Sequence, residues 1–131
     1  MDDSTLIGEA LKARESAYAP YSKFAVGAAL LCEDGEVFLG CNVENLSFGL
    51  TMCAERVAIG AAVAAGKRKF RAVAVVADTD EPISPCGACR QVLAEFEPSL
   101  RILLATVDGR RSEHSLAGLL PRPATGILNR A

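Results

Sequence analysis

The sequence has no tryptophan and one histidine, and aromatic residues make up only 5% of its 131 residues. So few aromatic side chains argue against a platform on which single-stranded nucleic-acid bases stack. Blocks of like charge are also missing, because 14 basic and 16 acidic residues are interspersed and leave a formal net charge of -2. This balance gives no electrostatic reason to expect a nucleic-acid partner or a polybasic membrane contact.

Long apolar runs are absent as well. No stretch approaches the ~20 residues that a membrane span requires. The start, Met1-Asp2-Asp3-Ser4, is acidic and unlike a signal peptide. We therefore expect a cytoplasmic protein without a membrane partner. The length predicts one domain, 1–131, in which residues 122–131 form a tail that is either flexible or at a subunit interface.

Hydrophobic periodicity predicts alternating helices and strands. Helices are expected over 5–17 with a cap at Ser4, over 53–65, over 84–96 with Ser84 as its cap, and around 115–120. Strands are expected over 25–31, 36–41, 70–77 and 101–107, the first two joined by a turn at 33–35. This order predicts an α/β layer fold in which helices cover both faces of a mixed sheet.

The predicted helix 53–65 carries only two charges, Glu55 and Arg56, both in its first turn. The remainder is apolar all round, which is typical of a buried helix. Buried charges must be paired or bound to a metal. Glu55 and Arg56 therefore need partners at the start of this helix.

Five cysteines, an odd number, argue against a disulfide framework. Cys32 and Cys41 lie in apolar strands, where a small core thiol is expected. Cys86 and Cys89 share one face of a helix start, and this pair alone fits a core stripe, a redox dithiol or a metal site equally well. Cys53 favours the metal, because it begins the helix that carries the unpartnered Glu55.

Two helix starts with three cysteines can converge on one cation, and the helix dipoles stabilise thiolates there. Three thiolates around Zn²⁺ leave a charge of about -1, which Arg56 can offset by donating hydrogen bonds to the sulfurs. Three protein ligands leave a position for water, as in catalytic zinc sites, and Glu55 can take that water's proton. His114 is expected to be a solvated side chain in a polar turn.

The motifs resemble a known family. Cys53-Ala54-Glu55 followed by Pro85-Cys86-Gly87-Ala88-Cys89 fits the three-cysteine signature of the zinc deaminases. Residues 18–24, 26–30, 40–45 and 89–92 extend the resemblance to the small homotetrameric cytidine deaminases, in register over 5–121. It implies a three-layer α/β/α sandwich with a mixed sheet of about five strands.

The resemblance also implies the chemistry. One Zn²⁺ per chain is bound by Cys53, Cys86 and Cys89, and zinc-bound hydroxide attacks C4 of cytidine or deoxycytidine with Glu55 as the proton shuttle. Arg56 lies behind the ligands, and the reaction serves pyrimidine salvage. The implied substrate contacts are Asn42 and Glu44 to the ribose hydroxyls, Phe24 to the pyrimidine ring, and backbone near Ala54 and Ser84 to the base edge.

Other interpretations stay open on the residues alone. Phe24 could be core, and Asn42 and Glu44 could shape a turn. The protein could deaminate a modified cytosine nucleoside such as blasticidin S, or be a non-catalytic zinc module or a dithiol redox protein. Two departures from the family matter: residues 122–125 lack the aromatic that often reaches a neighbouring subunit's site, and Phe48 stands where a tyrosine is common.

Overall fold

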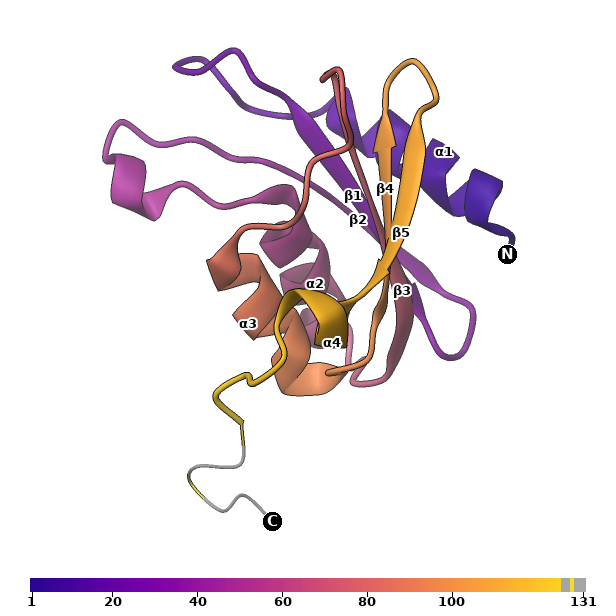
Figure 1. Cartoon of the computed structure of the whole chain (residues 1–131). Helices are drawn as coiled ribbons and strands as arrows, with labels where there is room; N and C mark the ends of the chain where they lie inside the picture. The colour runs from indigo at the N-terminus through magenta and orange to yellow at the C-terminus, as the bar shows by residue number, and fades with distance from the viewer. Residues whose placement is uncertain (126–127, 129–131) are drawn as a thin grey trace.

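Five strands form one mixed sheet in the order β2-β1-β3-β4-β5 in this computed structural model, which describes residues 1–125 and 128 (Figure 1). The strands are β1 (Val26–Cys32), β2 (Val37–Cys41), β3 (Phe70–Ala77), β4 (Arg101–Thr106) and β5 (Arg111–Ser115). β3 and β4 pair in parallel, and the other neighbours are antiparallel. The predicted mixed sheet of about five strands is confirmed.

Helices cover both faces of the sheet, as the sequence predicts. The helices are α1 (Asp3–Arg14), α2 (Ala54–Ala64), α3 (Gly87–Phe96) and α4 (Leu116–Leu119), with a 3-10 turn, η1 (Phe48–Leu50), before α2. α1 lies on one face, whereas α2 and α3 lie side by side on the other (Figure 1). Two separate apolar clusters fill the two interfaces, one under α1 and one under α2 and α3.

Two glycines allow the helices to approach the sheet closely. A Cβ at Gly27 would lie 2.0 Å from the carbonyl oxygen of Ala10 in α1. A Cβ at Gly40 would lie 2.2 Å from the carbonyl oxygen of Ala54, in the first turn of α2. Gly40 therefore sets how near the start of α2 lies to β2, and the candidate site residues begin there.

Several helix boundaries differ from the prediction. Asp2, not Ser4, caps α1, because its carboxylate accepts a 2.8 Å hydrogen bond from the Thr5 amide. α1 ends at Arg14, and residues 15–17 form a hydrogen-bonded turn. Ser84 does not cap α3: the helix starts at Gly87, with Cys86 at the N-cap position.

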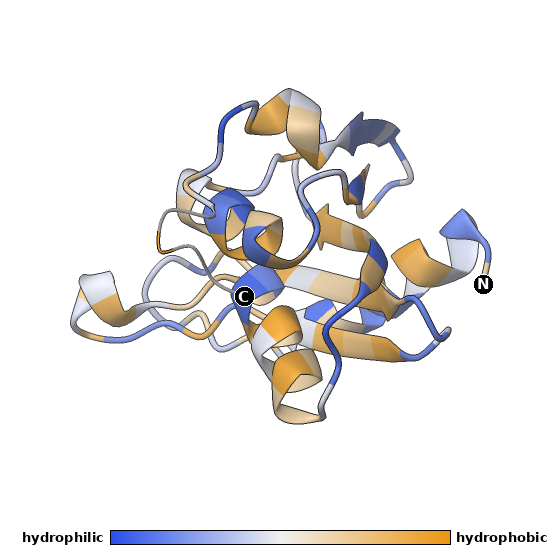
Figure 2. Cartoon of the chain, turned by 90° about the horizontal axis from the view of Figure 1, so that it is seen from below, coloured by the Kyte–Doolittle hydropathy of each residue, from blue (hydrophilic) through white to orange (hydrophobic). Residues whose placement is uncertain are grey.

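The sequence prediction missed β5. Its residues are almost all polar and exposed, as the hydropathy colouring shows, so no apolar alternation marks this edge strand (Figure 2). His114 lies in β5 opposite Ile102, not in a turn, although it is exposed as expected.

α2 is not buried all round. Ala58, Ile59 and Ala62 face the sheet, whereas Gly60, Ala61 and Ala64 are exposed within this chain. In the described residues, no helix is long and apolar enough to cross a membrane. Of the predicted tail 122–131, residues 126–127 and 129–131 lie outside the described residues.

Candidate metal centre and active site

Three cysteine sulfurs converge where α2 and α3 begin. Cys53 is the N-cap residue of α2, Cys86 is the N-cap residue of α3, and Cys89 lies one turn further along α3. Their Sγ atoms all lie within 4.8 Å of one another, with 3.8 Å between Cys53 and Cys86 and 3.4 Å between Cys86 and Cys89. Tetrahedral zinc with Zn–S bonds of about 2.3 Å holds its sulfurs about 3.8 Å apart, so this donor set fits Zn²⁺.

Hydrogen bonds among the three cysteines and Arg56 favour the thiolate form of Cys53. Hydrogen bonding from the Cys89 thiol, assisted by Arg56 and Cys86, lowers the pKa of Cys53 to about 5 despite partial burial. The hydrogen bond to Cys53 and burial raise the pKa of Cys89. One sulfur thus carries charge while its neighbours donate, and a divalent cation would replace these shared protons.

Arg56 reaches the sulfurs from the first turn of α2. Its Nη2 donates to Cys53 Sγ at 3.5 Å and to the carbonyl oxygen of Thr51 at 3.4 Å. The hydrogen bond to Cys53 raises the pKa of the guanidinium, which is therefore a fixed positive charge beside the sulfurs. Its Nε is buried without a partner among the described residues.

Glu55 is 4% exposed. Burial raises the pKa of its carboxyl group to about 7, and the neighbouring Cys53 charge adds to the shift. A carboxyl group with that pKa can both take up and release a proton at neutral pH. Glu55 shares a cavity of about 210 Å³ with Cys53 and Cys86, so the acid and the sulfurs face the same space.

The cavity brings together most of the residues predicted to contact substrate. Its lining consists of Phe24, Val26, Asn42, Thr51, Cys53, Ala54, Glu55, Ile83, Ser84 and Cys86. Phe24 is 39% exposed, so it is a wall residue and not part of the core. Val26, Thr51 and Ile83 were not predicted, because apolar and hydroxyl side chains carry no motif signal of their own.

Glu44 lies outside this cavity, in a neighbouring one of about 430 Å³ lined by Tyr21, Ser22, Glu44, Phe48 and Thr51. Thr51 borders both cavities. In this second cavity, called the outer cavity below, the Tyr21 and Phe48 rings pack edge to face with 5.9 Å between their centroids. A ligand can therefore extend from the sulfurs towards Glu44 past one shared wall residue.

Asn42 and Glu44 also hold the loop that carries Phe24. Asn42 Oδ1 accepts from the Val26 amide at 2.9 Å, and its Nδ2 donates to the Phe24 carbonyl oxygen at 2.7 Å. Glu44 accepts from the backbone amides of Tyr21 and Ser22 at 2.9 and 3.1 Å and from the Ser22 hydroxyl. The Ser22 hydroxyl lowers the pKa of Glu44, ahead of the two backbone donors, so this carboxylate is ionised.

The loop held by Glu44 contains an unusual backbone conformation. Lys23 has a φ of 60°, in the left-handed region that non-glycine residues rarely adopt. The Ser22 hydroxyl, which donates to Glu44, also accepts from the Phe24 amide at 3.0 Å. These bonds on either side of Lys23 keep the strained residue in place and direct Phe24 to the cavity.

Comparison with known proteins agrees with this geometry. Residues 1–105 match the family described as "Cytidine and deoxycytidylate deaminase zinc-binding region". The cytidine deaminase of Sporosarcina psychrophila is 57% identical over 122 residues, which cover 92% of this chain and 90% of that protein. The cytidine deaminase of Halalkalibacterium halodurans is 53% identical over 122 residues, covering 92% of each.

A solved structure is similar throughout. The 1.6 Å crystal structure of cytidine deaminase from Burkholderia pseudomallei superposes with a TM-score of 0.92 at 53% identity, covering 94% of this chain and 99% of that one. The sulfur triad, the buried carboxyl group and these matches lead to one conclusion. The chain belongs to the cytidine deaminase family, whose members bind zinc.

Proposed function

We propose that this protein catalyses the hydrolytic deamination of cytidine and deoxycytidine to uridine and deoxyuridine. The observation that carries the proposal is the convergence of three cysteine sulfurs from two helix starts, two of which, those of Cys53 and Cys86, line one cavity with the buried carboxyl group of Glu55. Cys53, Cys86 and Cys89 bind one Zn²⁺ per chain. The bound ion supplies Lewis acidity that lowers the pKa of a water molecule towards ~7.

Glu55 moves the protons. It accepts the proton that the attacking water loses and passes it to N3 of the cytosine ring. It then takes the proton of the new hydroxyl group on C4 and delivers it to the departing amino group. Cytidine and water thereby give uridine and ammonia. The raised pKa of Glu55, about 7, supports both halves of this cycle, because the carboxyl group is neither permanently ionised nor permanently protonated at neutral pH.

Arg56 offsets negative charge at the centre. Three thiolates around a divalent cation carry a net charge of about -1, and added negative charge would weaken the Lewis acid. Hydrogen bonds from the guanidinium to sulfur withdraw charge from the ligands. The 3.5 Å contact to Cys53 and the buried Nε support this role.

The substrate lies across the two cavities. Phe24 packs on the pyrimidine ring, and backbone groups at Ala54 and Ser84 bind the polar edge of the base. Glu44, ionised in the outer cavity, accepts from the ribose hydroxyls. Asn42 already uses both polar atoms on the backbone, but a carbonyl oxygen has a second lone pair and an amide nitrogen a second donor, so it can still bind a ribose hydroxyl.

We further propose one domain over 1–131, a cytoplasmic location, a place in pyrimidine salvage and assembly as a homotetramer. Exposed apolar side chains support assembly. Leu46, Phe48 and Leu50 are 78%, 72% and 67% exposed within this chain. Gly60, Ala61 and Ala64 of α2 are exposed as well, and contacts with neighbouring subunits would bury such apolar surface.

The test combines metal analysis with an ammonia-release assay. We expect about one zinc per chain and release of ammonia from cytidine and deoxycytidine. Glu55→Gln should retain zinc and lose about 10²–10⁴-fold in turnover. Activity confined to a modified cytosine nucleoside would replace the substrate assignment, and a zinc-loaded protein without any deaminase activity would contradict the enzymatic proposal.

A further inference from the structure

The side chain of Arg90, near the start of α3, makes two hydrogen bonds to backbone carbonyl oxygens that the proposed chemistry does not use. Its Nε donates to the carbonyl oxygen of Pro85 at 2.8 Å. Its Nη1 donates to the carbonyl oxygen of Leu119 at 2.9 Å. The first carbonyl belongs to the peptide that joins Pro85 to Cys86, and the second ends α4.

Arg90 binds the two peptides on either side of Cys86. The Arg90 backbone amide donates to the Cys86 carbonyl oxygen at 3.0 Å, so side chain and backbone of one residue bind consecutive carbonyls. Pro85 is buried, and Cys86 makes no side-chain cap hydrogen bond at the start of α3. The orientation of the Cys86 sulfur therefore depends on a peptide that the Arg90 guanidinium anchors.

The second acceptor of the Arg90 side chain, the Leu119 carbonyl oxygen, belongs to a helix that is itself held in place. α4 begins at Leu116, which is fully buried and whose amide donates to the Leu100 carbonyl oxygen at 2.8 Å. The last carbonyls of a helix lack partners within it, and a cation there also interacts favourably with the helix dipole. Arg90 donates to the Leu119 carbonyl oxygen at the end of α4. It thereby connects α4 to the peptide that precedes Cys86.

The next residue strengthens the same contact. Gln91 donates from Nε2 to the Ala124 carbonyl oxygen and accepts at Oε1 from the Ala124 amide, both at 3.1 Å. The consecutive side chains of Arg90 and Gln91 thus bind the end of α4 at Leu119 and the following segment at Ala124.

We propose that Arg90 is a positioning residue for the metal centre, fixing the Pro85–Cys86 peptide by bridging it to the end of α4. This inference rests on the proposed zinc site. A planar guanidinium can bond two carbonyls in different directions at once, whereas a lysine ammonium is a single point of charge. Loss of the bridge leaves the Cys86 ligand free to shift, and zinc then dissociates faster.

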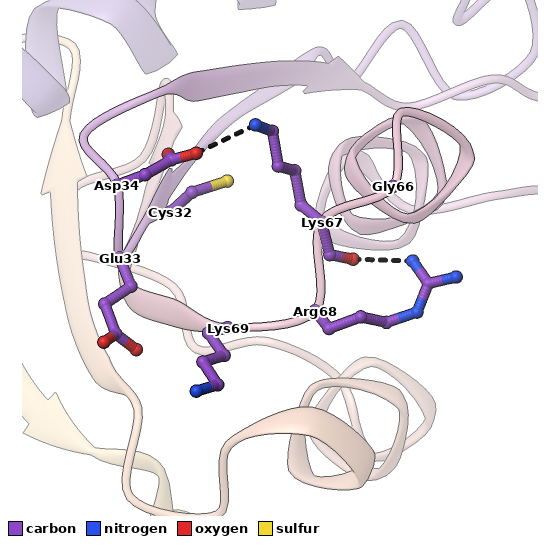
Figure 3. Close-up of a pocket in the computed structure, with 7 residues that line it drawn as sticks. All are labelled: Cys32, Glu33, Asp34, Gly66, Lys67, Arg68 and Lys69. Atoms are coloured by element: carbon purple, nitrogen blue, oxygen red, sulfur yellow. Dashed lines mark hydrogen bonds and ion pairs between the residues drawn. The ribbon is translucent and has the colours of Figure 1, made fainter.

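The chain offers a matched control. Arg68 Nη1 also donates to two backbone carbonyl oxygens, those of Val63 at 3.0 Å and Lys67 at 2.8 Å. It lies in a cavity at the far end of α2 with Cys32 and Lys67, and Figure 3 shows its bond to Lys67. Arg68→Met removes equivalent hydrogen bonds without touching the sulfur cluster.

The experiment measures the rate at which the zinc-loaded protein transfers its metal to excess chelator. Arg90→Met should release zinc about 10-fold faster, within the range known for residues that support metal ligands, while Arg68→Met matches the parent. Cobalt-loaded Arg90→Met should show an altered absorption spectrum, which a general loss of stability does not produce. Arg90→Lys should release zinc at a rate between those of the parent and Arg90→Met.

The inference would be overturned if Arg90→Met released zinc at the same rate as the parent or as Arg68→Met. It would also be overturned if Arg90→Lys released zinc at the parental rate. If Arg90→Met does not fold, the comparison of Arg90→Lys with Arg68→Lys decides the question in the same way. A parent protein that holds no zinc would contradict the proposed function instead, so the two failures are distinguishable.

Discussion

Gly40→Ala tests how the sheet positions the site. The new Cβ would lie 2.2 Å from the Ala54 carbonyl oxygen and 2.6 Å from the Ala58 amide nitrogen. Both atoms are helix backbone, so no flexible side chain can move aside. Restoring ordinary van der Waals separation requires the start of α2 to move by about 1 Å. Ala54 lies between Cys53 and Glu55, so that movement displaces a sulfur and the carboxyl group together.

Two magnitudes follow from this displacement. Overpacking of this kind costs about 1–3 kcal/mol of unfolding free energy. A misplacement of about 1 Å at a catalytic centre costs on the order of 10²-fold in rate. We therefore expect Gly40→Ala to lower the midpoint of urea unfolding and to reduce ammonia release from cytidine by about two orders of magnitude, with weaker zinc retention.

Two other glycines serve as controls. Gly27→Ala brings a Cβ within 2.0 Å of the Ala10 carbonyl oxygen, on α1 and across the sheet from the sulfurs. It should lose similar stability but keep its zinc. Gly8→Ala meets nothing within 4 Å in the exposed part of α1 and should gain about 0.5–1 kcal/mol. Parental ammonia release from Gly40→Ala would refute this reasoning. Zinc loss from Gly27→Ala as large as that from Gly40→Ala would refute it as well.

Three further substitutions test the site and the assembly. Arg56→Gln should keep the fold but lose zinc to a chelator faster, about 10-fold, and parental retention would remove its charge-offsetting role. Asn42→Ala should lower the unfolding free energy by about 1–3 kcal/mol, because the Val26 amide and the Phe24 carbonyl lose their hydrogen-bond partner. It should also raise KM for cytidine. Denaturant unfolding measures the first effect and steady-state kinetics the second, and an unchanged KM would contradict a contact between Asn42 and the substrate. Ala61→Glu places a charge on the exposed face of α2 and should shift the molar mass measured by light scattering from that of the proposed tetramer to that of one chain; a molar mass equal to the parent's would contradict a subunit contact at this face.

The sequence predicted those parts of the site that depend on local patterns. Cys86 and Cys89 are one helical turn apart, and Cys53 with Glu55 begins an otherwise apolar helix. Spacing and helix starts are short-range features, so the convergence of three sulfurs could be predicted. The central strands were also predictable, because short continuous apolar runs mark them.

Long-range contacts could not be predicted in the same way. The Asn42 side chain bonds Phe24 and Val26 across 16 to 18 residues, and Arg90 bonds Leu119 across 29. Backbone carbonyls and amides are the same at every position, so no sequence pattern marks those that a side chain will bind. β5 was not predicted, because its exposed polar residues lack hydrophobic periodicity. The close approach between Gly40 and α2 could not be predicted either, because it exists only once α2 packs on the sheet.

The most direct test of the account measures zinc content and ammonia release on the same preparations of the parent, Glu55→Gln and Cys86→Ala. We predict one zinc per chain in the parent and in Glu55→Gln, with turnover lost in the latter, and loss of both metal and activity in Cys86→Ala. An active parent without zinc, or a Glu55→Gln protein that turns over cytidine at the parental rate, would contradict it.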